Sequence, residues 1–152
     1  MAESEKAKLY REIVQETTEQ LQKVYVEPET DLDTRWWFEA LEQDRLEIPR
    51  CNACGRTFFP PQPDCPHCGA QDWRPIPAGG RGRIYSWVVC YLPFDPRFAE
   101  EVPYAILAVE LEEGVRLFGR WKGDLDAIRA DLRVQALVYR VDGHALLGWE
   151  AA

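Results

Sequence analysis

The 152-residue chain lacks a long hydrophobic run, because no stretch approaches the roughly twenty apolar residues that a membrane-spanning helix needs. It shows no signal peptide, since residues 1–14 carry several charges and no apolar segment. Histidine is scarce: His67 stands between two cysteines, and His144 follows a glycine in a predicted hairpin turn. We therefore expect a cytoplasmic protein without a membrane anchor, in which neither histidine acts as a general base.

Positive charge is also in short supply, with 18 basic against 26 acidic residues and a formal net charge of −8. This balance argues against a protein that reads a nucleic-acid backbone, because such proteins gain affinity by neutralising phosphates. Residues 51–98 are the exception, with five basic and three acidic residues. An anionic small molecule is expected to dock there if one binds, although such an excess is also common in solvated loops.

Cysteine is present in a pattern, because four of the five cysteines form two Cys-x-x-Cys pairs. The four are Cys51, Cys54, Cys65 and Cys68. Each pair is followed by a glycine, Gly55 or Gly69, which lets the backbone take a positive φ around an ion. Four soft thiolates in a tetrahedron suit zinc, and the short loop between the pairs predicts a compact zinc ribbon.

Three alternatives to this zinc site remain open at this stage. Iron is a competitor, because the same two knuckles hold iron in a rubredoxin. Two disulfides are disfavoured, since nothing in the chain points to export into an oxidising compartment. His67 lies inside the second knuckle and could be a ligand, but with four cysteines at hand we expect it to face solvent.

Two helices are expected before the ribbon. Apolar residues recur at three- and four-residue spacing over residues 4–26, and a second helix is predicted from about residue 33 toward residue 46. The second helix holds Trp36, Trp37 and Phe38, and three consecutive aromatic residues cannot share one helix face. Either at least one of them is offered to a partner, or all three are wedged between the ribbon and the domain that follows.

The period changes to that of strands after residue 79. Strands are predicted over residues 83–91, 104–111, 115–121, 133–141 and 145–150, with a short helical segment over 125–130. Three strands, a short helix and two strands are the order of an OB-fold barrel. The predicted fold class is therefore mainly β: N-terminal helices (1–47), a rubredoxin-like zinc ribbon (48–78) and a five-stranded OB-fold barrel (79–152).

Several motifs together resemble one known family. They are Cys-Asn-Ala-Cys-Gly-Arg, Phe-Pro-Pro, Cys-Pro-His-Cys-Gly, Gly-Arg-Gly-Arg-Ile-Tyr-Ser-Trp, Val-Pro-Tyr-Ala-Ile and Val-Glu-Leu-Glu-Glu-Gly-Val-Arg-Leu-Phe-Gly. In order and spacing they resemble the zinc-ribbon plus OB-fold family associated with acyl-CoA enzymes, long catalogued as domain of unknown function thirty-five. The resemblance covers about residues 34–150.

The resemblance implies an accessory role beside another enzyme. Members accompany thiolase-like enzymes, lipid-transfer-protein-like aldolases or hydratases that act on acyl-CoA, and some are fused to a hot-dog-fold hydratase in steroid side-chain degradation. The chain has no room for that second domain, so we expect either a separate subunit or the C-terminal part of a larger protein. We expect a non-catalytic subunit that supports carbon–carbon bond cleavage by its partner.

The residues themselves give little sign of catalysis. Cys90 lies in a predicted strand and is interpreted as a small buried hydrophobic residue. The acidic pairs at 100–101 and 112–113 are interpreted as solvated charge. Candidate contacts with a partner or with CoA are two sets, the aromatic helix residues Trp36, Trp37 and Phe38, and the arginines Arg81 and Arg83.

Two other functions are carried as alternatives. The first is single-stranded nucleic-acid binding, in which exposed rings would stack on bases; the candidates are Tyr85, Trp87, Tyr91, Phe118 and Trp121. The second is electron transfer by a rubredoxin-like iron site. The net charge of −8 weighs against the first, and the colour of the purified protein would decide the second, because ferric thiolate is red.

Overall fold

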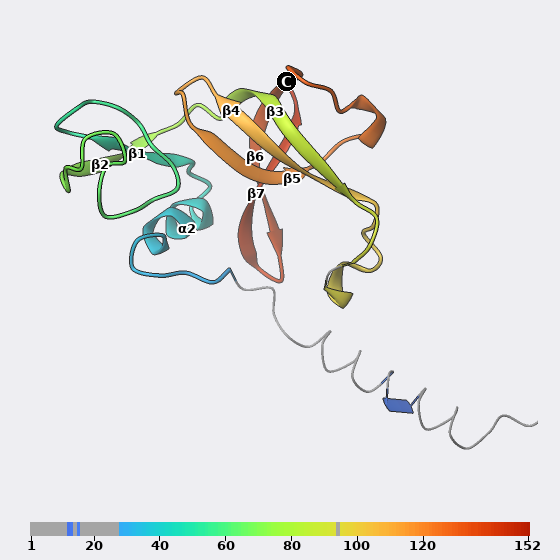
Figure 1. Cartoon of the computed structure of the whole chain (residues 1–152). Coiled ribbons are helices and arrows are strands. Elements are labelled where there is room, and N and C mark those ends of the chain that lie inside the picture. The colour runs from blue at the N-terminus through green and yellow to red at the C-terminus, as the bar shows by residue number, and fades with distance from the viewer. Residues whose placement is uncertain (1–11, 14, 16–27, 94) are drawn as a thin grey trace, which may run out of the picture.

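The computed structural model describes residues 12–13, 15, 28–93 and 95–152. The helix expected over residues 4–26 lies almost wholly outside this range, although the three described residues within it are helical. None of the described helices is long and apolar enough to cross a membrane. The remaining residues form a short helix, a two-stranded ribbon and a five-stranded barrel, arranged side by side (Figure 1).

The helix α2 (Arg35–Glu42) starts from a turn built by Asp31. One oxygen of the Asp31 carboxylate accepts the backbone N–H of Thr34 at 2.8 Å and its hydroxyl at 2.7 Å, which orders the chain just before the first helical turn. The helix is shorter than predicted, because Asp44 takes a positive φ of 56° and turns the chain into the ribbon. Trp37, Ala40 and Leu41 are its buried residues.

The ribbon is an antiparallel pair of strands, β1 (Glu47–Cys51) and β2 (Trp73–Pro77). In their register Cys51 lies opposite Trp73 at one end, and Glu47 lies opposite Pro77 at the other. Cys51 is the last residue of β1, and the rest of both cysteine knuckles lies in the long connection between the two strands. The strand pair therefore holds together the two ends of a loop that has almost no other regular structure.

The barrel is closed by five strands in the order β3-β4-β5-β7-β6. They are β3 (Arg81–Cys90), β4 (Tyr104–Leu111), β5 (Arg116–Trp121), β6 (Arg133–Val141) and β7 (His144–Ala151). The short helix η2 (Leu125–Ala127) lies between the third and fourth of these strands, and β5 pairs with β7 in parallel. The predicted OB-fold is confirmed. A further short helix, η1 (Pro96–Phe98), lies in the connection from β3 to β4.

The predicted strand boundaries hold within two residues, with one informative difference. The strand predicted over residues 83–91 starts two residues earlier, because Arg81 and Gly82 already belong to β3. Gly82 is needed there because a Cβ atom would stand 2.4 Å from the carbonyl oxygen of Glu110 on β4. The predicted hairpin at Asp142 and Gly143 is confirmed by φ values of 50° and 85°, which are typical of a type I′ turn.

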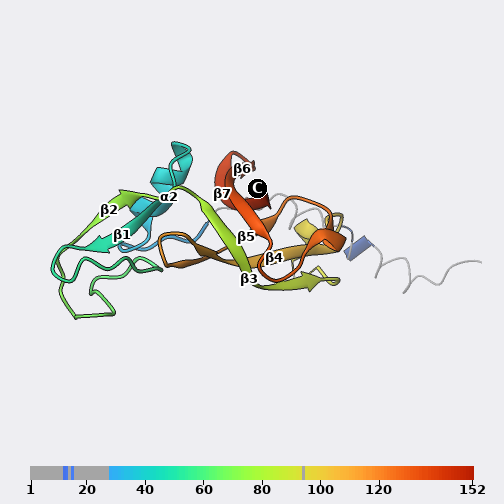
Figure 2. The same cartoon turned by 90° about the horizontal axis from the view of Figure 1, so that it is seen from above.

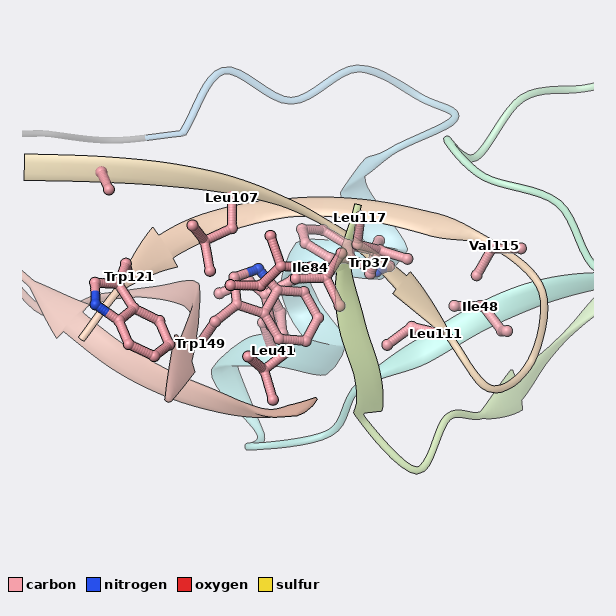
Figure 3. Packing of buried hydrophobic residues seen from close by; sticks show 14 of the residues in the cluster. Trp37, Leu41, Ile48, Ile84, Leu107, Leu111, Val115, Leu117, Trp121 and Trp149 are labelled. Atoms are coloured by element: carbon pink, nitrogen blue, oxygen red, sulfur yellow. The ribbon is translucent and has the colours of Figure 1, made fainter. Parts of the chain in front are cut away.

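The main core joins α2 to the barrel interior. Trp37 and Leu41 of α2 lie among barrel side chains such as Ile84, Leu117 and Trp149 (Figure 3). Glu42, at the end of the helix, accepts the backbone N–H of Ala145 in β7 at 2.7 Å. The helix therefore closes the barrel on the side of β7, and helix and barrel share one continuous core.

Candidate metal centre and contact surfaces

The four ribbon cysteines meet at one point. Their sulfur atoms all lie within 4.8 Å of one another, and Cys51 and Cys65 are buried while Cys54 and Cys68 are exposed. The Sγ–Sγ distance is 3.6 Å for Cys51 and Cys68, and 3.7 Å for Cys54 and Cys65. Metal–sulfur bonds of about 2.3 Å in a tetrahedron place the sulfurs about 3.8 Å apart. The geometry is therefore that of a tetrahedral thiolate site for a metal ion.

Each knuckle has the backbone turn that the sequence predicts. Gly55 donates its N–H to the carbonyl of Cys51 at 3.0 Å, and Gly69 donates to Cys65 at 2.8 Å. Both glycines have a positive φ, 74° and 76°, which other residues rarely adopt. The two turns are thus near copies of each other that face one another across the site.

The thiols influence one another electrostatically. The backbone N–H of Cys54 stabilises the thiolate of Cys51 and lowers its pKa from 9.0 to about 7. The N–H of Ala70 acts in the same sense on Cys68, but burial and the neighbouring sulfurs raise the pKa of Cys68 to about 11. Four thiolates cannot share so small a space unless a cation balances their charge, which is the role of a bound metal ion.

His67 is exposed and lies outside the group of four sulfurs. Its Nε2 atom is 3.1 Å from the carbonyl oxygen of Thr57, so the ring serves the fold of the ribbon loop. The expectation that this histidine faces solvent is confirmed.

The three helix aromatics are wedged between ribbon and barrel, which was one of the two alternatives. The ring of Trp36 lies 5.6 Å from that of Trp73 in the ribbon, and Trp37 contacts Phe59 at 5.4 Å between ring centroids. Trp37 is only 8% exposed. Trp37 is therefore a core residue rather than a surface contact. Trp36 and Phe38, which flank Trp37 in the sequence, are half-buried.

Arg81 and Arg83 are exposed and line a surface depression of about 630 Å³ at one end of the barrel. Both are already paired. Arg81 donates to Glu112 at 3.2 Å, and Arg83 donates to Glu110 at the same distance. An incoming phosphate would have to compete with these carboxylates for the guanidinium groups.

Glu113 has a structural role that the sequence did not indicate, because it was interpreted as solvated charge. One carboxylate oxygen accepts the N–H of Gly79 at 2.6 Å, and the other is buried. The carbonyl of the same residue accepts the hydroxyl of Thr57 in the ribbon at 2.7 Å. The turn between β4 and β5 thus ties the ribbon to the barrel. No local pattern signals this, since the partners lie 34 and 56 residues away.

Two other sequence expectations are resolved by burial. Trp121 was a candidate for stacking on bases, but it is 5% exposed in the core and its indole N–H donates to the carbonyl of Asp124. Cys90 is only half-buried, at the end of β3. It lies close to Tyr104, whose pKa is raised by burial and further by this thiol.

Two family models match the chain in succession. The first, described as the rubredoxin-like zinc ribbon domain of ChsH2, covers residues 38–74, and the second, the C-terminal OB-fold domain of ChsH2, covers residues 75–140. A chain of the solved "Ltp2-ChsH2(DUF35) aldolase" is 38% identical, with a TM-score of 0.76, over 82% of this chain and 98% of that one. The chain belongs to the ChsH2/DUF35 family.

Curated relatives carry several functional names. A probable enoyl-CoA hydratase alpha subunit of Thermomonospora curvata is 48% identical over 59% of this chain and 28% of its own length. A DUF35 domain-containing scaffold protein of Methanocaldococcus jannaschii is 35% identical over 57% and 61%. The benzoylsuccinyl-CoA thiolase subunit BbsA of Thauera aromatica is 28% identical over 66% and 71%. The chain thus spans less than two thirds of the first two relatives.

Proposed function

We propose that this chain is a non-catalytic accessory subunit or domain of a thiolase-like or lipid-transfer-protein-like aldolase. It docks onto that enzyme and supports cleavage of a carbon–carbon bond in an acyl-CoA, for example in the side chain of a steroid-CoA. The observation that carries the proposal is the match to almost the whole length of one chain of an aldolase complex at 38% identity. A hot-dog-fold hydratase is a further partner suggested by the hydratase subunit among the relatives.

The architecture supports an accessory role in a second way. The ribbon is fixed to the barrel through Glu113 and Thr57, and α2 is fixed to it through Glu42, so the described chain is suited to act as a rigid docking body. Such a body can order and enclose part of a partner's active site without supplying a reacting group. We expect it to work in the cytoplasm, where its thiols remain reduced.

The metal in this proposal is zinc, held by Cys51, Cys54, Cys65 and Cys68. When bound, zinc supplies no chemistry to the reaction and serves as a structural crosslink of the ribbon. Iron in the same sulfur set would give a red protein, whereas zinc gives a colourless one. Elemental analysis of freshly purified protein is expected to find close to one zinc and little iron per chain.

Arg81 and Arg83 are the proposed contacts for a CoA phosphate or an acidic loop of the partner. Both are exposed at the rim of the barrel depression. Their present carboxylate partners would be exchanged for the incoming anion. Replacing both by glutamine should raise the KM for acyl-CoA in the assembled complex more than it lowers kcat.

Co-expression tests the proposal directly. We expect this chain and the thiolase-fold subunit of the same genome to elute together on size-exclusion chromatography. The chain alone should turn over no acyl-CoA, and the complex should have cleavage activity that the enzyme subunit lacks alone. Separate elution together with full activity of the enzyme subunit by itself would refute the accessory role.

A further inference from the structure

The outer surface of β3, β4 and β5 is unusually apolar for an exposed sheet. Val88 is 59% exposed and Phe118 is 68% exposed. The strand register places Val88 opposite Ile106, and Phe118 opposite Ala108. Directly paired residues project to the same side of a sheet, and so do residues two apart on one strand. These side chains therefore form one continuous outer surface.

A β-bulge adds an aromatic residue to this surface. The register of β3 against β4 shifts between Ile84 and Ser86, so Tyr85 is the extra residue and is 56% exposed. The guanidinium carbon of Arg116 lies 3.5 Å from the centroid of its ring. Arg116 is held in turn by Glu110 at 3.1 Å. The pair is therefore ordered before any partner arrives, which lowers the entropic cost of binding.

We name this surface the β3–β5 face and define it by Tyr85, Val88, Ile106, Arg116 and Phe118. Tyr91 and Leu92, both exposed, follow directly after β3. Tyrosine and arginine are enriched at the energetic centres of protein interfaces. In its composition the face resembles such a centre.

Within the described residues, the rest of the chain leaves this face uncovered. The helix α2 contacts β7, and Figure 2 shows α2 with the β6–β7 pair on one side of the barrel and β3 and β4 on the other. The ribbon lies beyond the end of the barrel (Figure 1). As far as the described residues go, the face is therefore open to a separate partner.

The charge of the face points to the chemistry of that partner. The strands β3, β4 and β5 contain four arginines and one glutamate, in a chain whose net charge is −8. Glu101, Glu112 and Asp131, in the loops beside these strands, also pair with the arginines, so the charges around the face nearly cancel and its partner is recognised mainly by apolar contact. The arginines are also held by carboxylates, since Arg83 and Arg116 share Glu110 and Arg120 pairs with Glu101.

We propose that the β3–β5 face is the surface on which this chain docks the thiolase-fold subunit, an inference that rests on the proposed function. The partner presents an apolar patch to Phe118 and Val88, and the ordered Tyr85–Arg116 pair contacts the edge of that patch. A protein is favoured over single-stranded nucleic acid, because aliphatic side chains make up much of the face. Its arginines are also engaged by carboxylates, and the chain as a whole repels phosphate.

Binding measurements with charge-introducing variants test this proposal. The full chain is titrated against the purified thiolase-fold subunit of the same genome by isothermal titration calorimetry. Phe118→Asp and Val88→Asp should each raise the Kd about tenfold or more, since they place a carboxylate in an apolar contact. Leu32→Asp is the matched control, because Leu32 is 87% exposed and lies outside the face. Its Kd should stay within about twofold of wild type.

The outcomes separate the two proposals. If the wild-type chain binds and both face variants bind equally well, the docking surface lies elsewhere and the proposed function stands. If the wild-type chain does not bind, the proposed function fails and the docking face fails with it. Phe118→Ser replaces Phe118→Asp if the latter lowers the melting temperature. Micromolar binding of a fluorescent twenty-nucleotide single-stranded DNA that Phe118→Asp abolishes would make the face a nucleic-acid platform and overturn the inference.

Discussion

The ribbon and the barrel are stabilised by different means. The barrel and α2 share a cluster of fifteen buried hydrophobic residues, which include three tryptophans and only one residue of the ribbon strands, Ile48 of β1. The buried cluster of the ribbon contains only Cys51, Phe58 and Cys65, and two of these three are candidate metal ligands. A cluster of this size cannot offset the conformational entropy of a loop of more than twenty residues. The ribbon therefore depends on its ion, whereas the barrel depends on its own core.

The largest effect is expected from removing one metal ligand. Cys65→Ser should abolish metal binding and unfold the ribbon, because binding free energy in such modules, on the order of 10 kcal/mol, is also their folding free energy. The barrel should keep its cooperative melting transition. Metal content measures the binding, and hydrogen exchange shows whether the ribbon and the barrel are each folded. Cys90→Ser is the matched control and should retain the metal. Full metal retention in Cys65→Ser would contradict the proposed ligand set.

The next largest effect is expected in the core shared by α2 and the barrel. Trp37→Ala should lower the free energy of unfolding by about 3–5 kcal/mol, because it leaves a large cavity. Trp37→Phe should cost much less, since the indole N–H of Trp37 has no hydrogen-bond partner to lose. Urea denaturation of both variants gives the comparison. Equal stability of Trp37→Ala and wild type would show that α2 does not belong to the barrel core.

A smaller effect is expected where the two regions meet. Glu113→Ala should cost about 1–3 kcal/mol, since it leaves the N–H of Gly79 without its acceptor. Glu112→Ala, in the adjacent position, removes only an exposed ion pair with Arg81 and should change stability by less than about 1 kcal/mol. Thermal melting monitored separately in ribbon and barrel would detect the difference. Indistinguishable variants would show that the carboxylate of Glu113 does not stabilise the chain at Gly79, where the ribbon joins the barrel.

The smallest effect concerns the ion pairs on the surface of the barrel. Hydrogen bonds from Arg83 and then Arg116 hold the pKa of Glu110 below its ordinary value of 4.5. A lowered carboxylate pKa adds stability that is present above the ordinary value and is lost as the pH falls through the lowered one. Wild type should therefore exceed Glu110→Gln slightly in melting temperature at pH 7. The two should converge in acid, and a difference that grew on acidification would contradict this assignment.

The local patterns in the sequence predicted most of the fold. The two Cys-x-x-Cys-Gly knuckles predicted both the cluster of four sulfur atoms and the backbone turns, because the determinants of each knuckle lie within five residues. The strands 104–111 and 133–141 were predicted to the residue, since their apolar runs end at clear turn signals. The hairpin at Asp142 and Gly143 has the same local origin.

What the sequence could not predict depends on contacts between distant residues. Trp37 is of a residue type that often anchors interfaces, and only its packing against Phe59 and the barrel shows that it is internal. Glu113 was interpreted as solvated charge, because its hydrogen bond to Gly79, 34 residues away, leaves no sign in the sequence. The exposure of Tyr85 depends on a bulge in the register of β3 against β4, which no period in the sequence reveals.

Hydroxyl-radical footprinting of the free chain and of its complex with the thiolase-fold subunit tests the central claim most directly. The free chain should be oxidised at Tyr85, Phe118 and Leu32, which are all exposed. In the complex, the account predicts protection of Tyr85 and Phe118, with Leu32 oxidised as before. Unchanged oxidation of Tyr85 and Phe118 in a complex that protects other residues would contradict docking through the barrel.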